Sequence, residues 1–219
     1  MSTSSVIIYT DGSASVKERN GGWAYVALHG NRFKHGSGSA RPATISQMEL
    51  LAIAAALENI EPCDLPLEVF SDSRYAVDCI QQWIPTWLQN GWRTRVGEDV
   101  KNKDMLQRVW SIVQVHRKIA PVRFTWVPGH AGNPYNGRAD ELAGAARVKG
   151  SGETHYVGEI KYTSLTLRAN GEKFKVLLDS ASRRVVQATT RQPDVARKLS
   201  GLTTKEVYKL AKRRGWQNV

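Results

Sequence analysis

The chain has 219 residues and a formal net charge of +11, with 31 Lys and Arg against 20 Asp and Glu. Its length suits one large domain, or one medium domain with a small one. No apolar run approaches the roughly 18 residues of a membrane span, and the first residues carry no secretory pattern, so we expect a cytoplasmic protein without membrane contact. The two cysteines are too few for a disulfide framework and suit a reducing compartment.

The first two thirds of the chain alternate between strand and helix patterns. Strands are predicted at 6–11, 22–29, 31–38, 67–72 and 122–127. Helices are predicted at 46–59, 74–83, 85–90, 103–118 and 137–148. Three leading strands followed by alternating helices and strands predict an α/β domain over residues 1–148, a mixed five-stranded sheet flanked by helices.

The last third reads as a separate, small α+β domain over 156–219, joined by a linker at 149–155. Strands are predicted at 156–169 and 172–179 around Asn170-Gly171, a strong hairpin signal, and a third at 184–189. Short helices follow at 193–199 and from Leu202 to about 214.

Four acidic residues stand where strongly patterned segments end or begin. Asp11 closes the strand at 6–11 and Asp72 the strand at 67–72, while Glu49 and Asp140 lie near the starts of two helices. Carboxylates so placed can converge on one point, and Mg²⁺ prefers such oxygen ligands. Taken singly, each acid has another explanation, because Glu49 completes a capping-box pattern with Ser46, Asp140 suits a helix N-terminus, and the other two suit turns.

The segments around these acids resemble type I ribonucleases H, with the motifs in family order over about residues 5–148. The matching runs are Ile8–Ser13, Gln47–Leu50, Phe70–Tyr75, Trp126–Asn133 and Asn136–Ala143. The resemblance implies a ribonuclease H-like fold and an endonuclease that hydrolyses the RNA strand of RNA/DNA hybrids, leaving 5′-phosphate and 3′-hydroxyl ends.

The resemblance also assigns roles to the acids. It implies two Mg²⁺ ions, with Mn²⁺ as an alternative. Asp11 bridges the two, Asp140 joins it on the nucleophile side, and Glu49 and Asp72 hold the leaving-group side. Clustered carboxylates repel one another, so some of their pKa values should rise without metal. His130, in a glycine-rich loop, matches a histidine thought to assist catalysis or product release, and the alternative is a solvated loop histidine.

Hybrid contacts follow from the same resemblance. It places Gly12, Ser13, Ser46 and Gln47 against the RNA strand and Thr44 on a DNA phosphate. A helical handle would grip the DNA strand through Trp83, Trp87, Trp92, Arg93 and Arg95. Trp83 also sits on an apolar helical face, where packing is equally expected. Arg74 is also a predicted hybrid contact, although it stands where glutamine is common in the family. Leu88-Gln89-Asn90 stands where bacterial members often carry basic residues.

The C-terminal region carries most of the excess charge. Residues 151–219 hold 14 basic and 6 acidic residues, a net of +8, against +3 for residues 1–150. Such charge favours a polyanion, and the region would compensate for the weakened handle. The candidate contacts are Arg183, Arg184, Arg197, Lys205, Lys209, Lys212, Arg213 and Arg214, with Trp216 as a stacking residue. The rival interpretation is that this region docks on the first domain or on another protein.

Two other functions stay open from the sequence. One is a hybrid-binding module without turnover, against which the intact set of four acids argues. The other is a different nuclease of the same superfold, such as a junction resolvase. We expect a monomer acting on RNA/DNA hybrid.

Overall fold

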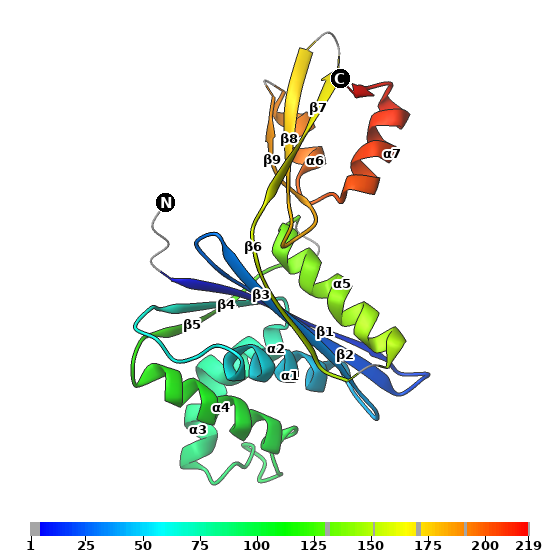
Figure 1. The fold of residues 1–219 in the computed structure, drawn as a ribbon. Helices are drawn as coiled ribbons and strands as arrows, with labels where there is room; N and C mark the ends of the chain where they lie inside the picture. Colours follow the sequence, from blue (N-terminus) through cyan, green and yellow to red (C-terminus); the bar gives the residue numbers. More distant parts are fainter. Residues whose placement is uncertain (1–4, 130–131, 151, 170–171, 191, 219) are drawn as a thin grey trace.

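A computed structural model describes residues 5–129, 132–150, 152–169, 172–190 and 192–218. Two sheets organise the chain, one of six strands and one of four (Figure 1). Helices cover both faces of the larger sheet, and the smaller sheet packs against two helices of its own. No helix of the described residues is long and apolar enough to cross a membrane.

The larger sheet is mixed, as predicted, in the order β5-β4-β1-β2-β3-β6. Its strands are β1 (Val6–Ser15), β2 (Asn20–His29), β3 (Arg32–Ala40), β4 (Leu67–Ser71), β5 (Val122–Trp126) and β6 (Thr154–Glu159). The pairs β1–β4 and β4–β5 are parallel, and the other neighbours are antiparallel. Side chains alternate between the faces, so Ile8 enters one core while Tyr9 enters the other.

A sixth strand was not predicted. The segment expected to form one strand at 156–169 forms two, β6 and β7 (Tyr162–Ala169), which belong to different sheets. β6 pairs antiparallel with β3, from Ser37 opposite Thr154 to Arg32 opposite Glu159. It covers backbone groups that β3 would otherwise leave unpaired at the sheet edge. The end of the predicted linker is therefore already strand.

The helices of the first domain lie on the two faces of this sheet. They are α1 (Ile45–Glu58), α2 (Arg74–Asp78), the π-helical turn η1 (Cys79–Trp83), α3 (Ile84–Gln89), α4 (Lys103–Arg117) and α5 (Pro134–Lys149). One core joins α1 and α4 to residues such as Ile8, Val69 and Phe124. The other face carries α5, whose Ala139 packs with Tyr9, and Figure 1 shows the two layers on opposite sides of the strands.

The C-terminal sheet has the order β10-β7-β8-β9. Its elements after β7 are β8 (Glu172–Asp179), β9 (Val185–Thr189), α6 (Pro193–Leu199), α7 (Thr204–Arg214) and β10 (Gln217–Asn218). Leu167, Phe174 and Val207 form its separate core. The expected turn at Asn170-Gly171 lies outside the described residues, and the strands on either side pair antiparallel. β10 was missed, because two residues are too few to give a strand pattern.

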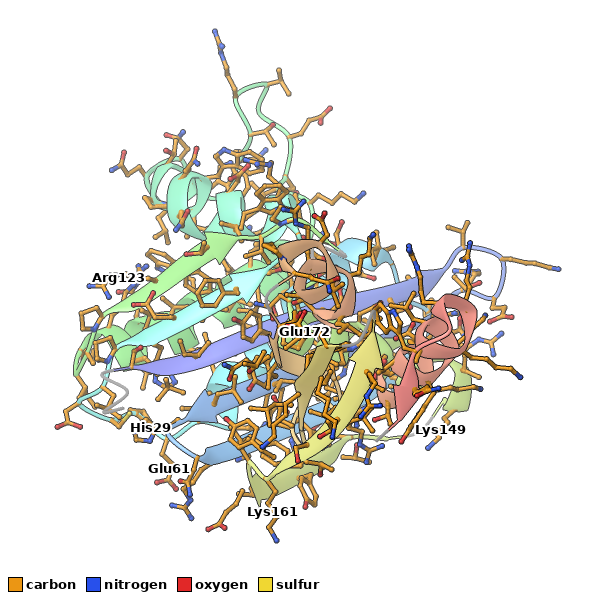
Figure 2. All side chains as sticks on the ribbon, turned by 90° about the horizontal axis from the view of Figure 1, so that it is seen from above. His29, Glu61, Arg123, Lys149, Lys161 and Glu172 are labelled. Atoms are coloured by element: carbon orange, nitrogen blue, oxygen red, sulfur yellow. The ribbon has the colours of Figure 1, made fainter. Side chains whose placement is uncertain are left out.

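The C-terminal region packs directly on the first domain. Ala181 is buried in the core on the α5 face of the larger sheet, beside Phe33 and Ala139. Arg184 forms an ion pair with Glu141 of α5. Seen from above in Figure 2, the smaller sheet and its helices overlie the larger sheet. Part of this basic region is therefore committed to an internal interface.

Candidate active site

Parallel pairing of β1 and β4 brings the first two acids together. The pairing runs from Val6 opposite Leu67 to Thr10 opposite Ser71. Asp11 directly follows Thr10 and Asp72 directly follows Ser71, so both acids lie where the parallel pairing ends. β1 itself continues to Ser15, paired with β2. Asp11 is thus held inside a strand rather than in a turn, which removes the turn-former explanation for this residue.

Gly12 allows the third acid to approach. A Cβ atom at Gly12 would lie 2.6 Å from the Glu49 nitrogen and 2.9 Å from the Met48 carbonyl carbon. Only glycine therefore lets β1 and the start of α1 pack this closely. The helix is capped by Thr44, whose hydroxyl accepts from the Gln47 backbone amide. The predicted capping box of Ser46 with Glu49 was wrong, since Glu49 is the fifth residue of α1, two positions beyond the capping-box glutamine Gln47, and is buried.

The fourth acid is carried by α5. This helix begins at Pro134, capped by Asn133, so Asp140 lies well inside it and not at its N-terminus as predicted. A Cβ atom at Gly22 of β2 would collide with the Ala143 carbonyl oxygen. The helix backbone therefore rests directly on the sheet. Asp140 lines the same cavity, of about 480 Å³, as the other three acids.

The acid cluster concentrates negative charge in a partly buried cavity, which is unfavourable for its carboxylates. Oxygens of Asp11, Glu49 and Asp72 lie within 4.8 Å of one another. Burial, then the negative charges of Asp72 and Asp140, raise the pKa of Asp11 to about 8, although the Gly12 amide donates to it. Burial and the charges of Asp11 and Asp72 raise the pKa of Glu49 well above its usual value. Glu49 Oε2 is buried without a hydrogen-bond partner.

These observations fit a divalent-cation site. A bound cation would satisfy the orphaned Glu49 oxygen and lower the raised carboxyl pKa values. The ligand set consists only of carboxylate oxygens, which suits a hard cation such as Mg²⁺. The cavity also leaves space beside the cluster for water or phosphate oxygens.

The predicted hybrid contacts separate into two groups. Gly12, Ser46 and Arg74 line the cavity with the acids. The other group makes intramolecular bonds instead. The Ser13 hydroxyl accepts from Arg147 Nε at 3.0 Å, and Thr44 and Gln47 hydrogen-bond each other in the helix cap. Ile45, which stands where the family resemblance places a frequent asparagine beside the 2′-hydroxyl site, also lines the cavity. Ser73 and Tyr75 line it too and were not among the predicted contacts.

The three handle tryptophans form one aromatic chain with very different exposure. The ring centroids are 5.8 Å apart between Trp83 and Trp87 and 6.3 Å apart between Trp87 and Trp92. Trp83 is 40% exposed, whereas Trp92 is 8% exposed and belongs to the core. Trp83, for which packing and contact were equally expected, therefore presents the most accessible ring. Arg93 and Arg95 are exposed, and Arg93 Nη1 donates to the Gly97 carbonyl.

The segment before His130 lies against the acid cluster. Trp126 Nε1 donates to the Asp72 carbonyl at 3.0 Å, and the Arg74 guanidinium lies 4.2 Å from the Trp126 ring centroid. A Cβ atom at Gly129 would be 2.9 Å from Asp72 Oδ2. His130 lies outside the described residues, so its role stays a prediction.

Comparison with known proteins decides the family. Residues 3–148 match the family model described as RNase H. The chain belongs to the ribonuclease H family. It is 42% identical over 145 residues to "Ribonuclease H" of Bradyrhizobium diazoefficiens, which covers 66% of this chain and 90% of that protein. It is 41% identical over 139 residues to "Ribonuclease H" of Alcanivorax borkumensis, covering 63% and 88%. With an acid cluster of this kind, the chain is a ribonuclease H enzyme.

Solved structures support the same fold. A type 1 RNase H, LC9-RNase H1, described as carrying the type 2 active-site motif, matches with a TM-score of 0.58 and 24% identity, covering 69% of this chain and 77% of that one. A foamy viral protease-reverse transcriptase in complex with RNA/DNA hybrid matches with a TM-score of 0.56 and 18% identity, covering 66% and 20%. Both confirm the predicted ribonuclease H-like architecture.

Proposed function

We propose that this ribonuclease H hydrolyses the RNA strand of RNA/DNA hybrids by a two-metal-ion mechanism, releasing 5′-phosphate and 3′-hydroxyl ends. The observation that carries the proposal is the convergence of four carboxylates on one cavity, with a buried Glu49 oxygen that has no partner. Family membership supports the proposed substrate, because this chain aligns with most of the length of relatives that are named Ribonuclease H.

Asp11, Glu49, Asp72 and Asp140 would hold two divalent ions, with Mg²⁺ as the expected metal and Mn²⁺ as an alternative. When bound, the ions supply the positive charge that an in-line phosphodiester displacement requires. Asp11 interacts electrostatically with each of the other three acids, which suits the bridging role. Because the pKa of Asp11 is about 8 without metal, this carboxyl must lose a proton before it can act as a ligand.

The chain's other cavity residues would position the substrate. Hydrogen bonding by the Gly12 amide lowers the pKa values of both Asp11 and Glu49 and so favours the charged forms that bind a cation. Arg74, held over the Trp126 ring, places a fixed cation at the cavity, where a backbone phosphate would lie. Ser46 offers a hydroxyl for the 2′-hydroxyl edge of the RNA strand. His130 would assist proton transfer or product release.

The DNA strand would contact the handle mainly through Trp83 and the exposed Arg93 and Arg95. Trp92 supports the handle from within, because its ring is buried. The C-terminal region would add phosphate contacts through the basic side chains of α6 and α7. Arg184, just before β9, is paired with Glu141 instead. Trp216 is partly buried and packs edge-on against Phe174, so part of its ring is already engaged with the core of the smaller sheet. We expect the protein to act as a monomer.

Cleavage of three substrates tests this proposal. RNA/DNA hybrid, double-stranded RNA and single-stranded RNA, each carrying a label on one RNA strand, are incubated with the full-length protein with and without Mg²⁺. We expect cleavage of the hybrid alone, only with the metal, and products that a 5′-phosphate-dependent exonuclease then degrades. Cleavage of double-stranded RNA at a similar rate, or cleavage in EDTA, would contradict the proposal.

A further inference from the structure

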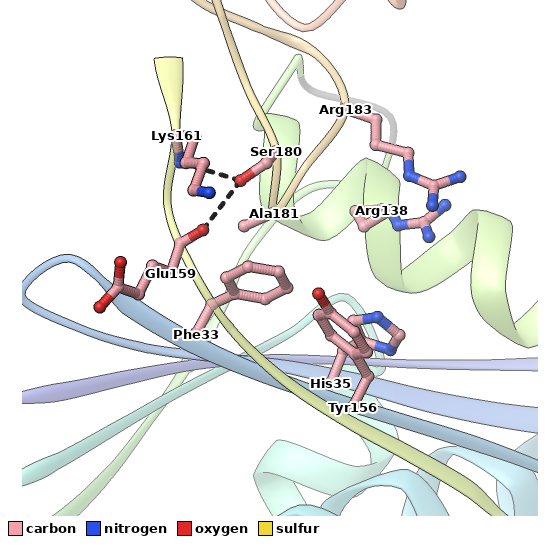
Figure 3. Close-up of a pocket in the computed structure, with 9 residues that line it drawn as sticks. All are labelled: Phe33, His35, Arg138, Tyr156, Glu159, Lys161, Ser180, Ala181 and Arg183. Carbon is pink, nitrogen blue, oxygen red and sulfur yellow. Dashed lines mark hydrogen bonds between the residues drawn. The ribbon is translucent and has the colours of Figure 1, made fainter.

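A second cavity lies where the C-terminal region meets the first domain. It has a volume of about 670 Å³ and is bounded by β3, β6, α5 and the turn that follows β8 (Figure 3). The two cavities share no lining residue among those described. Arg138 lines this cavity and Asp140 the first one, and two positions on a helix differ by about 200° around its axis. The second cavity is therefore separate from the acid cluster, across α5.

Positive charge gathers at this second cavity. Arg138, Arg183 and Lys161 line it, against one acid, Glu159. Figure 3 shows the Glu159 carboxylate turned away from the two guanidinium groups, which lie near each other on the far side of the pocket. Both guanidinium groups are positively charged and therefore repel each other, and an anion bound between them removes that repulsion.

The carboxylate that pairs with Arg138 is shared with a second arginine. Arg138 Nη1 lies 3.3 Å from Glu141 Oε2, while the other Glu141 oxygen is paired with Arg184. One carboxylate thus serves two guanidinium groups. The described residues provide no ion pair for the side chain of Arg183, which is exposed. Arg183 is consequently available for an external anion.

Arg183 is also held in an unfavourable backbone conformation. Its φ is 57°, in the left-handed region that costs a residue with a Cβ atom about 1 kcal/mol. The turn that imposes it is tied down, because the Arg183 amide donates to the Asp179 carbonyl and the Ser182 amide to Asp179 Oδ1. Ser180 Oγ accepts from the Lys161 amide and donates to the Glu159 carbonyl, which fixes the opposite wall (Figure 3). Strain held in place by such bonds is typical of functional positions.

Three aromatic side chains line this cavity together with the two arginines. The His35 and Tyr156 rings stack with centroids 5.2 Å apart, and Phe33 lies 5.6 Å from Tyr156. Burial, then the positive charges of Arg138, Arg183 and His155, lower the pKa of His35 to about 4, so this ring is neutral at pH 7. Tyr156 is 54% exposed, which leaves ring surface open for a planar group.

We propose that this cavity binds a nucleotide unit, with its phosphate on Arg138 and Arg183 and its base against Tyr156. The pairing of guanidinium groups with an exposed aromatic ring matches the two chemical halves of a nucleotide. The unit comes either from a free mononucleotide or from a single strand that crosses the junction of the two sheets. This inference is independent of the proposed cleavage reaction, because no acid of the cluster takes part.

Calorimetric titration of the full-length protein in EDTA tests it, with adenosine 5′-monophosphate, adenosine, inorganic phosphate and a short single-stranded DNA as probes. EDTA prevents cleavage and removes the metals that would favour binding at the acid cluster. We expect the monophosphate to bind more tightly than adenosine or phosphate alone. Arg183→Gln should weaken its binding about tenfold or more, the effect of losing one charged hydrogen bond. The matched control is Arg168→Gln, an exposed arginine on β7 that does not line the cavity.

Two tyrosine variants separate contact from folding. Tyr156→Ala should weaken the monophosphate and adenosine alike, whereas Tyr156→Phe should keep both, and thermal unfolding shows whether β6 is intact. Tighter binding of DNA than of the monophosphate, with the same loss in Arg183→Gln, identifies a strand as the source, and equal affinities identify a free nucleotide. The inference is overturned if neither the monophosphate nor the DNA binds, or if Arg183→Gln binds them as well as Arg168→Gln does.

Discussion

Replacing Asp11 by Asn should stabilise the metal-free protein, and the gain should grow with pH. Asp11 has an ordinary pKa of 3.8 and a folded-state pKa of about 8. Between these values the folded state holds a proton that the unfolded state has lost, so stability falls as pH rises from about 4 to about 8. At pH 7 the difference of roughly three pKa units corresponds to about 4 kcal/mol. Asparagine carries no charge and still accepts from Gly12.

Part of that energy is lost to relaxation. Water entering the open cavity and the neighbouring Glu49 both adjust to the charge, so we expect about 2 kcal/mol for the substitution. For a chain of this size that raises the melting temperature by about 5 °C at pH 8. The assay is thermal unfolding by circular dichroism in EDTA at several pH values, with the exposed Asp64→Asn as the matched control.

The dependence on pH decides the outcome. The gain for Asp11→Asn should vanish below about pH 3, where the wild-type carboxyl is protonated in both states. Added Mg²⁺ should stabilise the wild type at pH 8 and leave the variant almost unchanged. A gain that is the same at pH 5 and pH 8, or a loss at pH 8, would refute the explanation by repulsion and burial.

Four further predictions concern packing, docking, phosphate contacts and the catalytic loop. Gly12→Ala should lower the free energy of unfolding in urea by about 1 to 3 kcal/mol and lower cleavage sharply, because its Cβ would press on the Glu49 backbone. Unchanged stability would mean that β1 and α1 separate freely. Arg184→Gln should weaken the packing of the C-terminal region on the first domain, so hydrogen exchange should become faster in residues 162–218 and stay unchanged in residues 5–129. An equal change in both regions would contradict a docked interface. A fragment of residues 1–160, which keeps β6, should cleave hybrid with weaker binding and a shallower salt dependence, and equal salt slopes would eliminate phosphate contacts by the removed part. His130→Ala should slow multiple turnover without abolishing it, and an unchanged rate would favour a solvated histidine.

The approach of Asp11 to Asp72 could be predicted because the sequence pattern marks the apolar runs that precede them, whereas Glu49 and Asp140 lie inside their helices and not at the predicted starts. Asp11 and Asp72 follow apolar runs that become parallel neighbours, and parallel neighbours end at the same edge. The cap of α1 was misplaced by two residues because Ser46 with Glu49 and Thr44 with Gln47 have the same spacing. Local pattern alone does not choose between them, and packing of Glu49 into the core does.

Features that depend on contacts between distant segments could not be predicted. Nothing in the run from 154 to 169 shows that its first part pairs with β3 while its second part starts another sheet. The ion pair of Arg184 with Glu141 joins residues 43 positions apart, and both look like ordinary surface charges in the sequence. The cavity at Arg183 arises only where the two sheets meet, so no motif announces it.

The central claim is that the acid cluster cuts the RNA strand of a hybrid. Its most direct test compares wild type, Asp11→Asn and Asp64→Asn on an RNA/DNA hybrid with a labelled RNA strand, in Mg²⁺, alongside hybrid binding by each protein. The account predicts that Asp11→Asn loses cleavage by at least about a hundredfold yet still binds hybrid, while Asp64→Asn cleaves like wild type. Cleavage by Asp11→Asn at a rate close to wild type would contradict it.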